Sequence, residues 1–319
     1  AATIVMRMPA LSSALALLLA AVSVGAQEGT AGRAPTTLFE YAMAVEKAGT
    51  KWDSVQYAAF QQNVAVHAKE LVSKNDKGFT PVHVAALLGM ATILDAFLFR
   101  CSQEGFDCIG SVNAEGLSLL HIAVQSDTQN VVEKIEVLTR HGAQLEAVDS
   151  NGLTPLHYAA QKDNVRAVIE LVRGKADVHA LVPGPEHTPL HLATIAGQPG
   201  SIRALAAAGA HVDAQDITGY TPLHLAVLKR HPSCIKALLK AGAKPDVRSN
   251  FGSGEGNGAT PLHAAVKFGC LSCVKDLVAA GADIDLEVQG MNSLEIAGVD
   301  EEMLRALTLM APLKGPDEL

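Results

Sequence analysis

Histidine and cysteine give this chain its widest chemical range, because both bind transition metals and cysteine also forms disulfides. The 319 residues include 12 histidines and 5 cysteines. Six of the histidines belong to a repeated motif, which spaces them along the chain. His179 and His211 occupy similar places in successive segments, but two imidazoles without a third ligand make a weak metal site. We therefore expect no bound metal.

Motifs of known catalytic centres are also missing from the sequence. It contains no His-Glu-x-x-His and no Gly-x-Ser-x-Gly. The Gly-rich segment from Arg248 to Ala259 ends in Gly258-Ala259-Thr260, whereas a phosphate-binding loop needs Gly followed by Lys and Ser or Thr. We read this segment as an extended finger. We expect no catalytic residues, no cofactor and no enzymatic activity.

The cysteines allow two kinds of chemistry. Cys101 and Cys108 bracket a short loop and could close a disulfide across it in an oxidising compartment. Cys270 and Cys273 form a C-x-x-C, the spacing of redox-active pairs, but without the alternating strands and helices of redox proteins around it. Cys234 and Cys273 lie in the same phase of two similar segments, where a buried small residue is expected. The odd count predicts at least one free thiol.

A motif of the form Thr-Pro-Leu-His-x-Ala organises the chain around these residues. It is intact from Thr154, Thr188, Thr221 and Thr260, and altered from Thr80 and Ser118. Its histidines are separated by 38, 36, 34, 33 and 39 residues and are, in order, His83, His121, His157, His191, His224 and His263. Thr at a helix N-cap followed by Pro in the first turn marks a helix start. Each motif therefore predicts the beginning of a helix.

A second signature follows each motif in fixed phase. Ala241-Gly242-Ala243 and Ala280-Gly281-Ala282 end apolar segments, and Gly suits the left-handed residue that terminates a helix. With this period and this motif, the chain resembles the ankyrin repeat family. The resemblance implies an all-α repeat solenoid of helix-turn-helix repeats joined by β-hairpin loops. It also implies binding of other macromolecules.

The domain boundaries follow from where the motif is present. We expect a helical N-terminal cap over 37–74, six repeats over 75–290 and a C-terminal capping repeat over 291–319. Terminal repeats of such arrays differ from the internal ones because they must cover an apolar face.

The first 36 residues read as a targeting segment. Arg7, an apolar run from Leu11 to Val24 and the small residues before Gln27 predict a signal peptide over 1–26, followed by a linker over 27–36. We expect an exported protein, periplasmic or secreted, with no integral membrane span in the mature chain. The alternative is an uncleaved N-terminal segment that anchors the array to a membrane.

The charge and composition restrict the partner. The formal net charge is −8, which argues against nucleic acid. Only 4% of the residues are aromatic, which suits a solenoid core of Leu, Val and Ala. We expect a monomer that binds a protein partner. The competing function is that of a redox-responsive cell-envelope protein that protects against oxidative stress, with Cys270 and Cys273 cycling between thiol and disulfide.

In the family that this chain resembles, the residues just before the Thr and just after the inner helix line a concave surface. They are expected to owe nothing to the packing between repeats. The partner-binding residues predicted in this way are Phe79, Leu87, Leu88, Gln125, Lys162, Tyr220, Leu228, Lys229, Arg230, Lys267 and Phe268. Aromatic residues and Arg among them are the types that dominate interface energetics.

Overall fold

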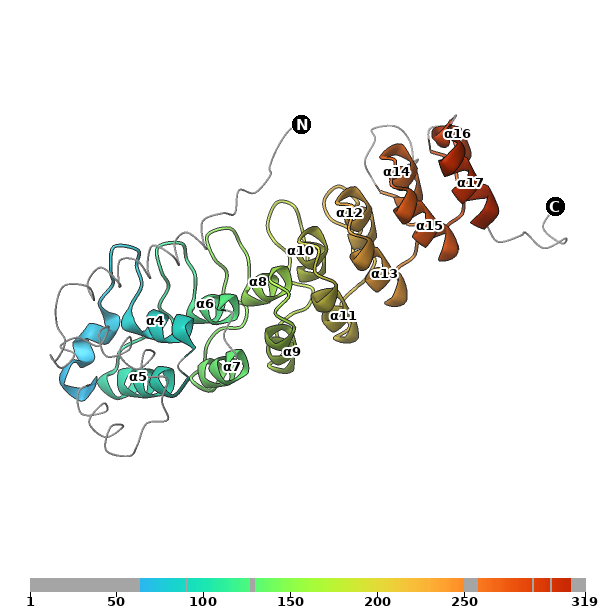
Figure 1. The fold of residues 1–319 in the computed structure, drawn as a ribbon. Helices are drawn as coiled ribbons and strands as arrows, with labels where there is room; N and C mark the ends of the chain where they lie inside the picture. Colours follow the sequence, from blue (N-terminus) through green and yellow to red (C-terminus); the bar gives the residue numbers. More distant parts are fainter. Residues whose placement is uncertain are drawn as a thin grey trace, which may run out of the picture.

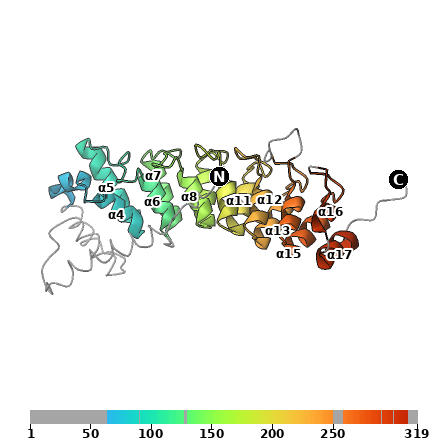
Figure 2. The ribbon, with the colours of Figure 1, turned by 90° about the horizontal axis from the view of Figure 1, so that it is seen from above.

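The computed structural model describes residues 64–89, 91–126, 130–249, 258–288, 290–298 and 300–310. The predicted signal peptide and linker, most of the N-terminal cap and most of the Gly-rich segment lie outside these ranges. The described chain forms one elongated array of helix pairs (Figure 1). Seen from above, the pairs follow one another in a single row (Figure 2).

Two layers of antiparallel helices make up the array. The inner layer consists of α4 (Pro81–Leu88), α6 (Leu119–Gln125), α8 (Pro155–Gln161), α10 (Pro189–Ile195), α12 (Pro222–Leu228), α14 (Pro261–Lys267) and α16 (Ser293–Ala297). The outer layer consists of α5 (Ala91–Glu104), α7 (Val131–Arg140), α9 (Val165–Arg173), α11 (Pro199–Ala207), α13 (Pro232–Lys240), α15 (Leu271–Ala279) and α17 (Glu301–Met310). Each inner helix packs against its own outer helix and against the inner helices of its neighbours. The predicted all-α repeat solenoid is confirmed.

The repeated motif starts each inner helix with a reciprocal cap. In α12 the Thr221 side chain accepts a hydrogen bond from the His224 backbone N–H, and the His224 ring accepts one from the Thr221 N–H. Pro222 fills the first helical position, where the missing N–H is not needed. The same capping box is present at the other five motifs and, with Asn292 and Glu295, at α16.

The loops between repeats project from the inner-helix side of the array (Figure 1). Their turns are held by a side chain: Asp149 Oδ1 accepts from the backbone N–H of Asn151 and Leu153 at 2.9 and 2.8 Å. Only isolated bridges, such as Val112 with Ser118, join the two arms of a loop, and the described ranges contain no strand. The predicted β-hairpin loops are therefore tight turns without extended ladders.

The core is a continuous stack of aliphatic side chains between the two layers. The motif alanines, among them Ala159, Ala193 and Ala226, are wholly buried, which lets adjacent inner helices approach closely. At the N-terminal end the 3-10 helix η1 (Ala68–Val72) packs on α4 and α5 and buries Leu71. At the C-terminal end α17 packs on α15 and α16.

Candidate interaction surface

The motif histidines connect each repeat to the next. Nδ1 of His224 accepts from a backbone N–H, so the ring proton is on Nε2, which donates to the Ala259 carbonyl at 2.9 Å. His121, His157, His191 and His263 bond in the same way to carbonyls in the following loops, at 2.8 to 3.2 Å. Burial lowers the pKa of His157, His191 and His224 to about 4. These five rings are structural and neutral, as the sequence interpretation expected of the motif.

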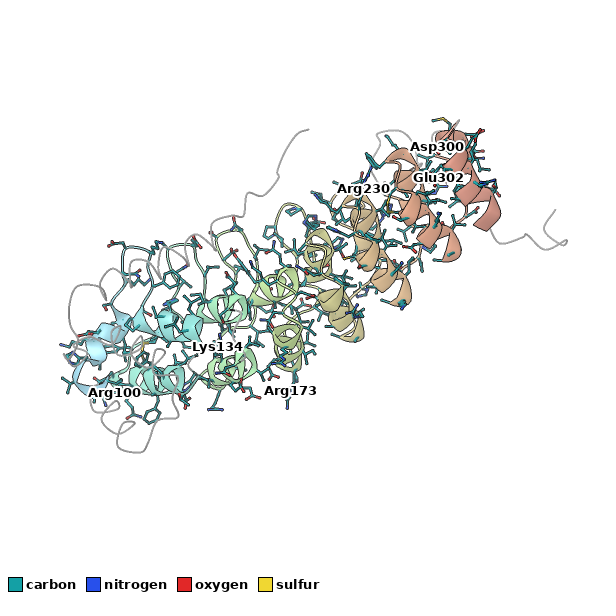
Figure 3. All side chains as sticks on the ribbon, in the orientation of Figure 1. Arg100, Lys134, Arg173, Arg230, Asp300 and Glu302 are labelled. Atoms are coloured by element: carbon teal, nitrogen blue, oxygen red, sulfur yellow. A yellow bond between two sulfur atoms is a disulfide. The ribbon has the colours of Figure 1, made fainter. Side chains whose placement is uncertain are left out.

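A buried cation, Lys134, also connects neighbouring repeats. Lys134 in α7 has no exposed surface, and its Nζ donates to the Ala86 and Ala123 carbonyls and to Ser126 Oγ (Figure 3). Burial lowers the pKa of Lys134 to about 8. The sequence analysis did not single out this residue, because a Lys in an amphipathic helix normally faces solvent.

Most of the predicted partner-binding residues lie at the C-terminal ends of inner helices. Gln125, Leu228 and Lys267 end their helices, Lys162, Lys229 and Phe268 are C-caps, and Arg230 follows Lys229. Leu87 and Leu88 end α4, whereas Phe79 and Tyr220 precede the N-caps of α4 and α12. The structure therefore brings these residues to two edges of the inner layer. We call these edges, together with the loops, the inner face.

Three of these residues take part in packing, contrary to expectation. Phe79, Leu87 and Leu228 are half buried and pack against the core of the array. The expectation that they owe nothing to packing is wrong for these three, because their side chains contact the buried core. Phe268, by contrast, is 48% exposed.

Arg230 and Phe268 are connected across two repeats. Arg230 Nη2 donates a hydrogen bond to the Phe268 carbonyl. Arg230 has a left-handed backbone, with φ of 55°, at a position where other repeats have Gly197 and Gly269 with φ of 76° and 66°. A non-Gly residue at positive φ is strained, and such strain tends to persist at functional sites.

The loops carry an apolar row that the sequence interpretation missed. In three successive loops an apolar residue directly precedes the residue that opens the turn: Val112, Val148 and Leu181. In the next loop Ile217 follows the equivalent residue, Asp216. The side chains of Val148, Leu181 and Ile217 are 58, 54 and 62% exposed. We call these four residues the loop row. Adjacent loops are hydrogen-bonded, as from Ser150 N to the Glu115 carbonyl at 3.1 Å, which fixes the row in place. The signal was present in the sequence as an apolar residue at one fixed phase of three successive turns.

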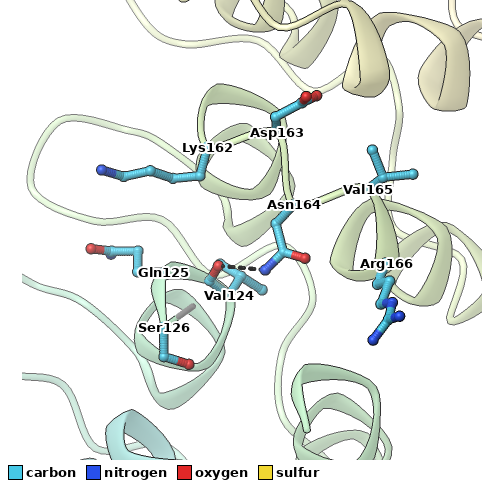
Figure 4. A pocket seen from close by; sticks show the side chains of 8 residues that line it. All are labelled: Val124, Gln125, Ser126, Lys162, Asp163, Asn164, Val165 and Arg166. Carbon is cyan, nitrogen blue, oxygen red and sulfur yellow. Dashed lines mark hydrogen bonds between the residues drawn. The ribbon is translucent and has the colours of Figure 1, made fainter. Parts of the chain in front are cut away.

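A hollow of about 450 Å³ lies beside the C-terminal ends of α6 and α8 (Figure 4). Gln125 and Lys162, both predicted as partner-binding, line it together with the first turn of α9. Asn164 donates to the Val124 carbonyl at 3.1 Å and so joins the two repeats across its floor. Its lining residues are mostly polar, which suits a polar group of a partner.

The cysteines form two pairs. The structure joins Cys101 to Cys108 and Cys270 to Cys273 by disulfides, and Cys234 is free and buried. Burial raises the pKa of the Cys234 thiol to about 11. Cys273 is buried, as the sequence interpretation expected. It is not a free thiol, however, because its sulfur is bonded to Cys270.

The described residues form neither a cluster of metal ligands nor a membrane-spanning helix. No three His, Cys, Asp or Glu side chains come together as metal ligands within the described residues. The His179 and His211 rings do approach, with centroids 4.2 Å apart. Among the described helices, none combines the length and the apolar character needed to cross a membrane.

Comparisons with family models and with solved structures both identify ankyrin repeats. A family model described as ankyrin repeats in three copies matches residues 93–182, 168–249 and 219–288. Among solved structures, the ankyrin repeat domain of Bcl-3, described as a unique member of the IκB protein family, superposes with a TM-score of 0.64 at 26% identity, covering 73% of this chain and 99% of that one. The human ASB11 ankyrin repeat domain has a TM-score of 0.57 at 25% identity, covering 74% and 100%.

Longer relatives match only in part. Mouse Rabankyrin-5 is 30% identical over 142 residues, which are 44% of this chain and 12% of that protein. The palmitoyltransferase AKR1 of Lachancea kluyveri is 34% identical over 134 residues, 41% of this chain and 17% of that enzyme. The chain thus spans less than a fifth of the length of these two relatives.

Proposed function

Because the chain belongs to the ankyrin repeat family, whose repeats generally serve as protein–protein interaction modules, we propose that it is a non-enzymatic module that binds a protein partner. The inner face, which corresponds to the concave face expected of the family, makes the contact. No nucleic acid and no cofactor take part, and the chain acts as a monomer. The acidic net charge of −8 supports a protein partner over a polyanion.

The loop row carries this proposal. Its four aliphatic side chains lie on four successive loops, three of them at the same phase, and all four are exposed. Single exposed apolar residues are ordinary on protein surfaces, but an aligned group is typical of an interface. The row would bury its apolar surface when a partner lies across the loops.

The predicted anchor residues support the same face. Phe268 is exposed, and Arg230 is held beside it at a strained backbone position. Lys229 and Lys267 are exposed next to them, so this end of the inner face offers an aromatic ring surrounded by cations. Such a surface fits a partner that presents both apolar and acidic groups.

The experiment is capture of partners on the immobilised chain. The triple variant Val148→Ser, Leu181→Ser, Ile217→Ser removes the three most exposed members of the loop row. Ile169→Ser, which changes a 56% exposed residue on the outer helix α9, is the matched control. We expect a protein retained by the parent and by the control and lost by the triple variant. Equal retention by the parent, the control and the triple variant would show that the partner does not bind through the inner face.

The cellular location is part of the proposal. We propose that the protein acts outside the cytoplasm, periplasmic or secreted, on the basis of the leader-like sequence before Gln27. The two disulfides support this, because such bonds persist in oxidising compartments. N-terminal sequencing of the protein from its native cells checks it: a start at Gln27 supports export with cleavage, and an intact leader in the membrane fraction favours the anchored alternative.

A redox-responsive role is the second candidate, and one observation favours it. The Cys270–Cys273 disulfide begins two residues after Phe268, which places it beside the inner face. In this role peroxide oxidises the two thiols to the disulfide and is itself reduced to two waters. Thiol titration of the reduced chain before and after peroxide tests it. No loss of thiols at Cys270 and Cys273 would rule the role out.

A further inference from the structure

The hollow between the second and third helix pairs has a specific polar character. Gln125, at the end of α6, is one of its lining residues, and both of its amide atoms are buried beneath the surface without a hydrogen-bond partner. A buried amide that makes no hydrogen bond costs free energy that a ligand can recover. The Gln125 amide can donate to an oxygen of a ligand and accept from an N–H of the same ligand.

The charges around the hollow are mainly positive. Lys162 and Arg166 are exposed at its rim, and neither forms an ion pair with another described residue. Figure 4 shows the Lys162 side chain extending on the same side as Gln125. The first turn of α9 adds the positive end of a helix dipole. An anion would be attracted to this position.

A buried cation lies directly behind the lining. Ser126, which lines the hollow, accepts a hydrogen bond from Lys134 Nζ, whose other acceptors are two neutral carbonyls. No described carboxylate forms an ion pair with Lys134. The charge of Lys134 is therefore not compensated within the described part of the chain, and it favours an anion bound above Ser126.

Asp163 is the one carboxylate among the described residues of the lining, and it already accepts a hydrogen bond. Its Oδ1 accepts from the Ser201 backbone N–H at 2.6 Å, at the start of α11. Figure 4 shows its carboxylate directed away from Gln125. Gly200 leaves room for it, because a Cβ there would lie 2.7 Å from Asp163 Oδ1. At the next junction, between the third and fourth helix pairs, the Asp163 carboxylate therefore occupies the N-terminus of α11.

We propose that the hollow lined by Gln125, Ser126, Lys162 and Arg166 binds the carboxylate of an Asp or Glu side chain on the protein partner. This inference rests on the proposed function and adds the chemistry of the residue that the partner inserts. The carboxylate accepts from the Gln125 amide, which turns outward to meet it, and pairs with Lys162, whereas Arg166, on the far side of the hollow, adds only to the positive field (Figure 4). The partner's backbone N–H donates to the Gln125 carbonyl oxygen.

The test uses the full chain and an acetylated, amidated hexaglutamate peptide as the probe. Binding is followed by the NMR shift of the Gln125 side-chain amide, and the hexaglutamine peptide is the uncharged comparison. The double variant Lys162→Gln, Arg166→Gln removes the rim charges. Arg203→Gln, Lys240→Gln makes the same change of net charge on exposed sites of outer helices and is the matched control.

We expect hexaglutamate to shift the Gln125 amide, with a Kd raised at least fivefold in the rim variant and unchanged within twofold in the control. Equal binding of hexaglutamine, no shift at Gln125, or equal losses in both variants would overturn the proposal. Asp127 follows Ser126 and lies outside the described residues, so Asp127→Asn is measured in the same series. Binding that appears only in Asp127→Asn would assign the hollow to the chain's own carboxylate and also overturn it.

The peptide experiment and the capture experiment can fail independently of each other. If a partner is retained through the loop row but hexaglutamate leaves Gln125 unshifted, the carboxylate site is wrong and the proposed function stands. If hexaglutamate binds at Gln125 and no protein is retained by the inner face, the proposed function fails and the site remains a carboxylate site.

Discussion

The Nζ atom of Lys134 donates a hydrogen bond of 3.0 Å to the backbone carbonyl of Ala86, across the boundary between two repeats. In α9, α11 and α13 the same position holds a small residue, namely Ala167, Ser201 and Cys234. The longer side chain of Lys134 reaches from the outer layer to the ends of two inner helices. It therefore fixes the relative position of α4 and α6 through an interaction that the regular repeats lack.

The pH dependence of stability should reveal this buried cation. Burial lowers the pKa of Lys134 to about 8, below the value of 10.5 for an exposed lysine. Between these values the unfolded chain binds more protons, so the free energy of unfolding rises with pH. Relative to Lys134→Met, the parent should gain about 1–2 kcal/mol between pH 8 and pH 10 in urea titrations. Parallel curves for the two proteins would show that Lys134 titrates as an exposed side chain.

Acid should destabilise the array through its histidines. Burial lowers the pKa of His157, His191 and His224 to about 4 from 6.5. Below pH 6.5 the unfolded chain takes up protons that the folded rings do not, so stability falls until pH 4 is reached. Each ring should cost about 1–2 kcal/mol at pH 5, measured by urea unfolding at pH 7 and pH 5. His224→Gln should lose less over this interval than the parent, and an equal loss would contradict the mechanism.

The thiol count should separate bonded from free cysteines. With two disulfides, the denatured chain should react with a thiol reagent at one site per molecule without reductant and at five with it. The folded chain should not react at pH 8, because Cys234 is buried and its pKa is raised to about 11. Cys234→Ala should abolish the remaining reaction. Three reactive thiols in the denatured chain would mean that one disulfide is absent.

Relief of backbone strain should separate stability from binding. Arg230→Gly replaces a residue at φ of 55° by one that adopts this conformation freely, which should stabilise the fold by up to about 1 kcal/mol while weakening retention of the partner. Lys175→Gly, at φ of 73° after α9, is the control: it should stabilise the fold and leave retention unchanged. Thermal unfolding and the capture assay measure the two effects. Unchanged retention by Arg230→Gly would remove Arg230 from the binding surface.

The contact of Asp163 with α11 can be tested through Gly200. Gly200→Ala places a Cβ 2.7 Å from Asp163 Oδ1 and should displace the carboxylate from the Ser201 N–H. Loss of this charge-assisted hydrogen bond should cost about 1–2 kcal/mol in urea unfolding. Gly174→Ala, whose Cβ would lie no closer than 3.3 Å to other atoms, should have a smaller effect. If the two substitutions cost the same, Asp163 does not act as a cap of α11.

Much of the fold could be predicted because its determinants are local. The Thr, Pro and His of each motif act within one helical turn, as the Thr221 and His224 capping box shows, and so the start of each inner helix can be read from the sequence. Gly at the helix ends acts over a similar distance. These signals repeat in fixed phase, which determines the number of repeats and their order.

The candidate site depended on contacts between repeats, which local patterns do not encode. Phe79, Leu87 and Leu228 have sequence positions typical of a binding surface, but neighbouring helices half bury them. The burial of Lys134 likewise follows from contacts with the inner helices of two repeats. The sequence by itself determined the repeat, its caps and its array. Only the tertiary structure decided which side chains remain exposed, because exposure depends on the residues that the next repeat brings alongside.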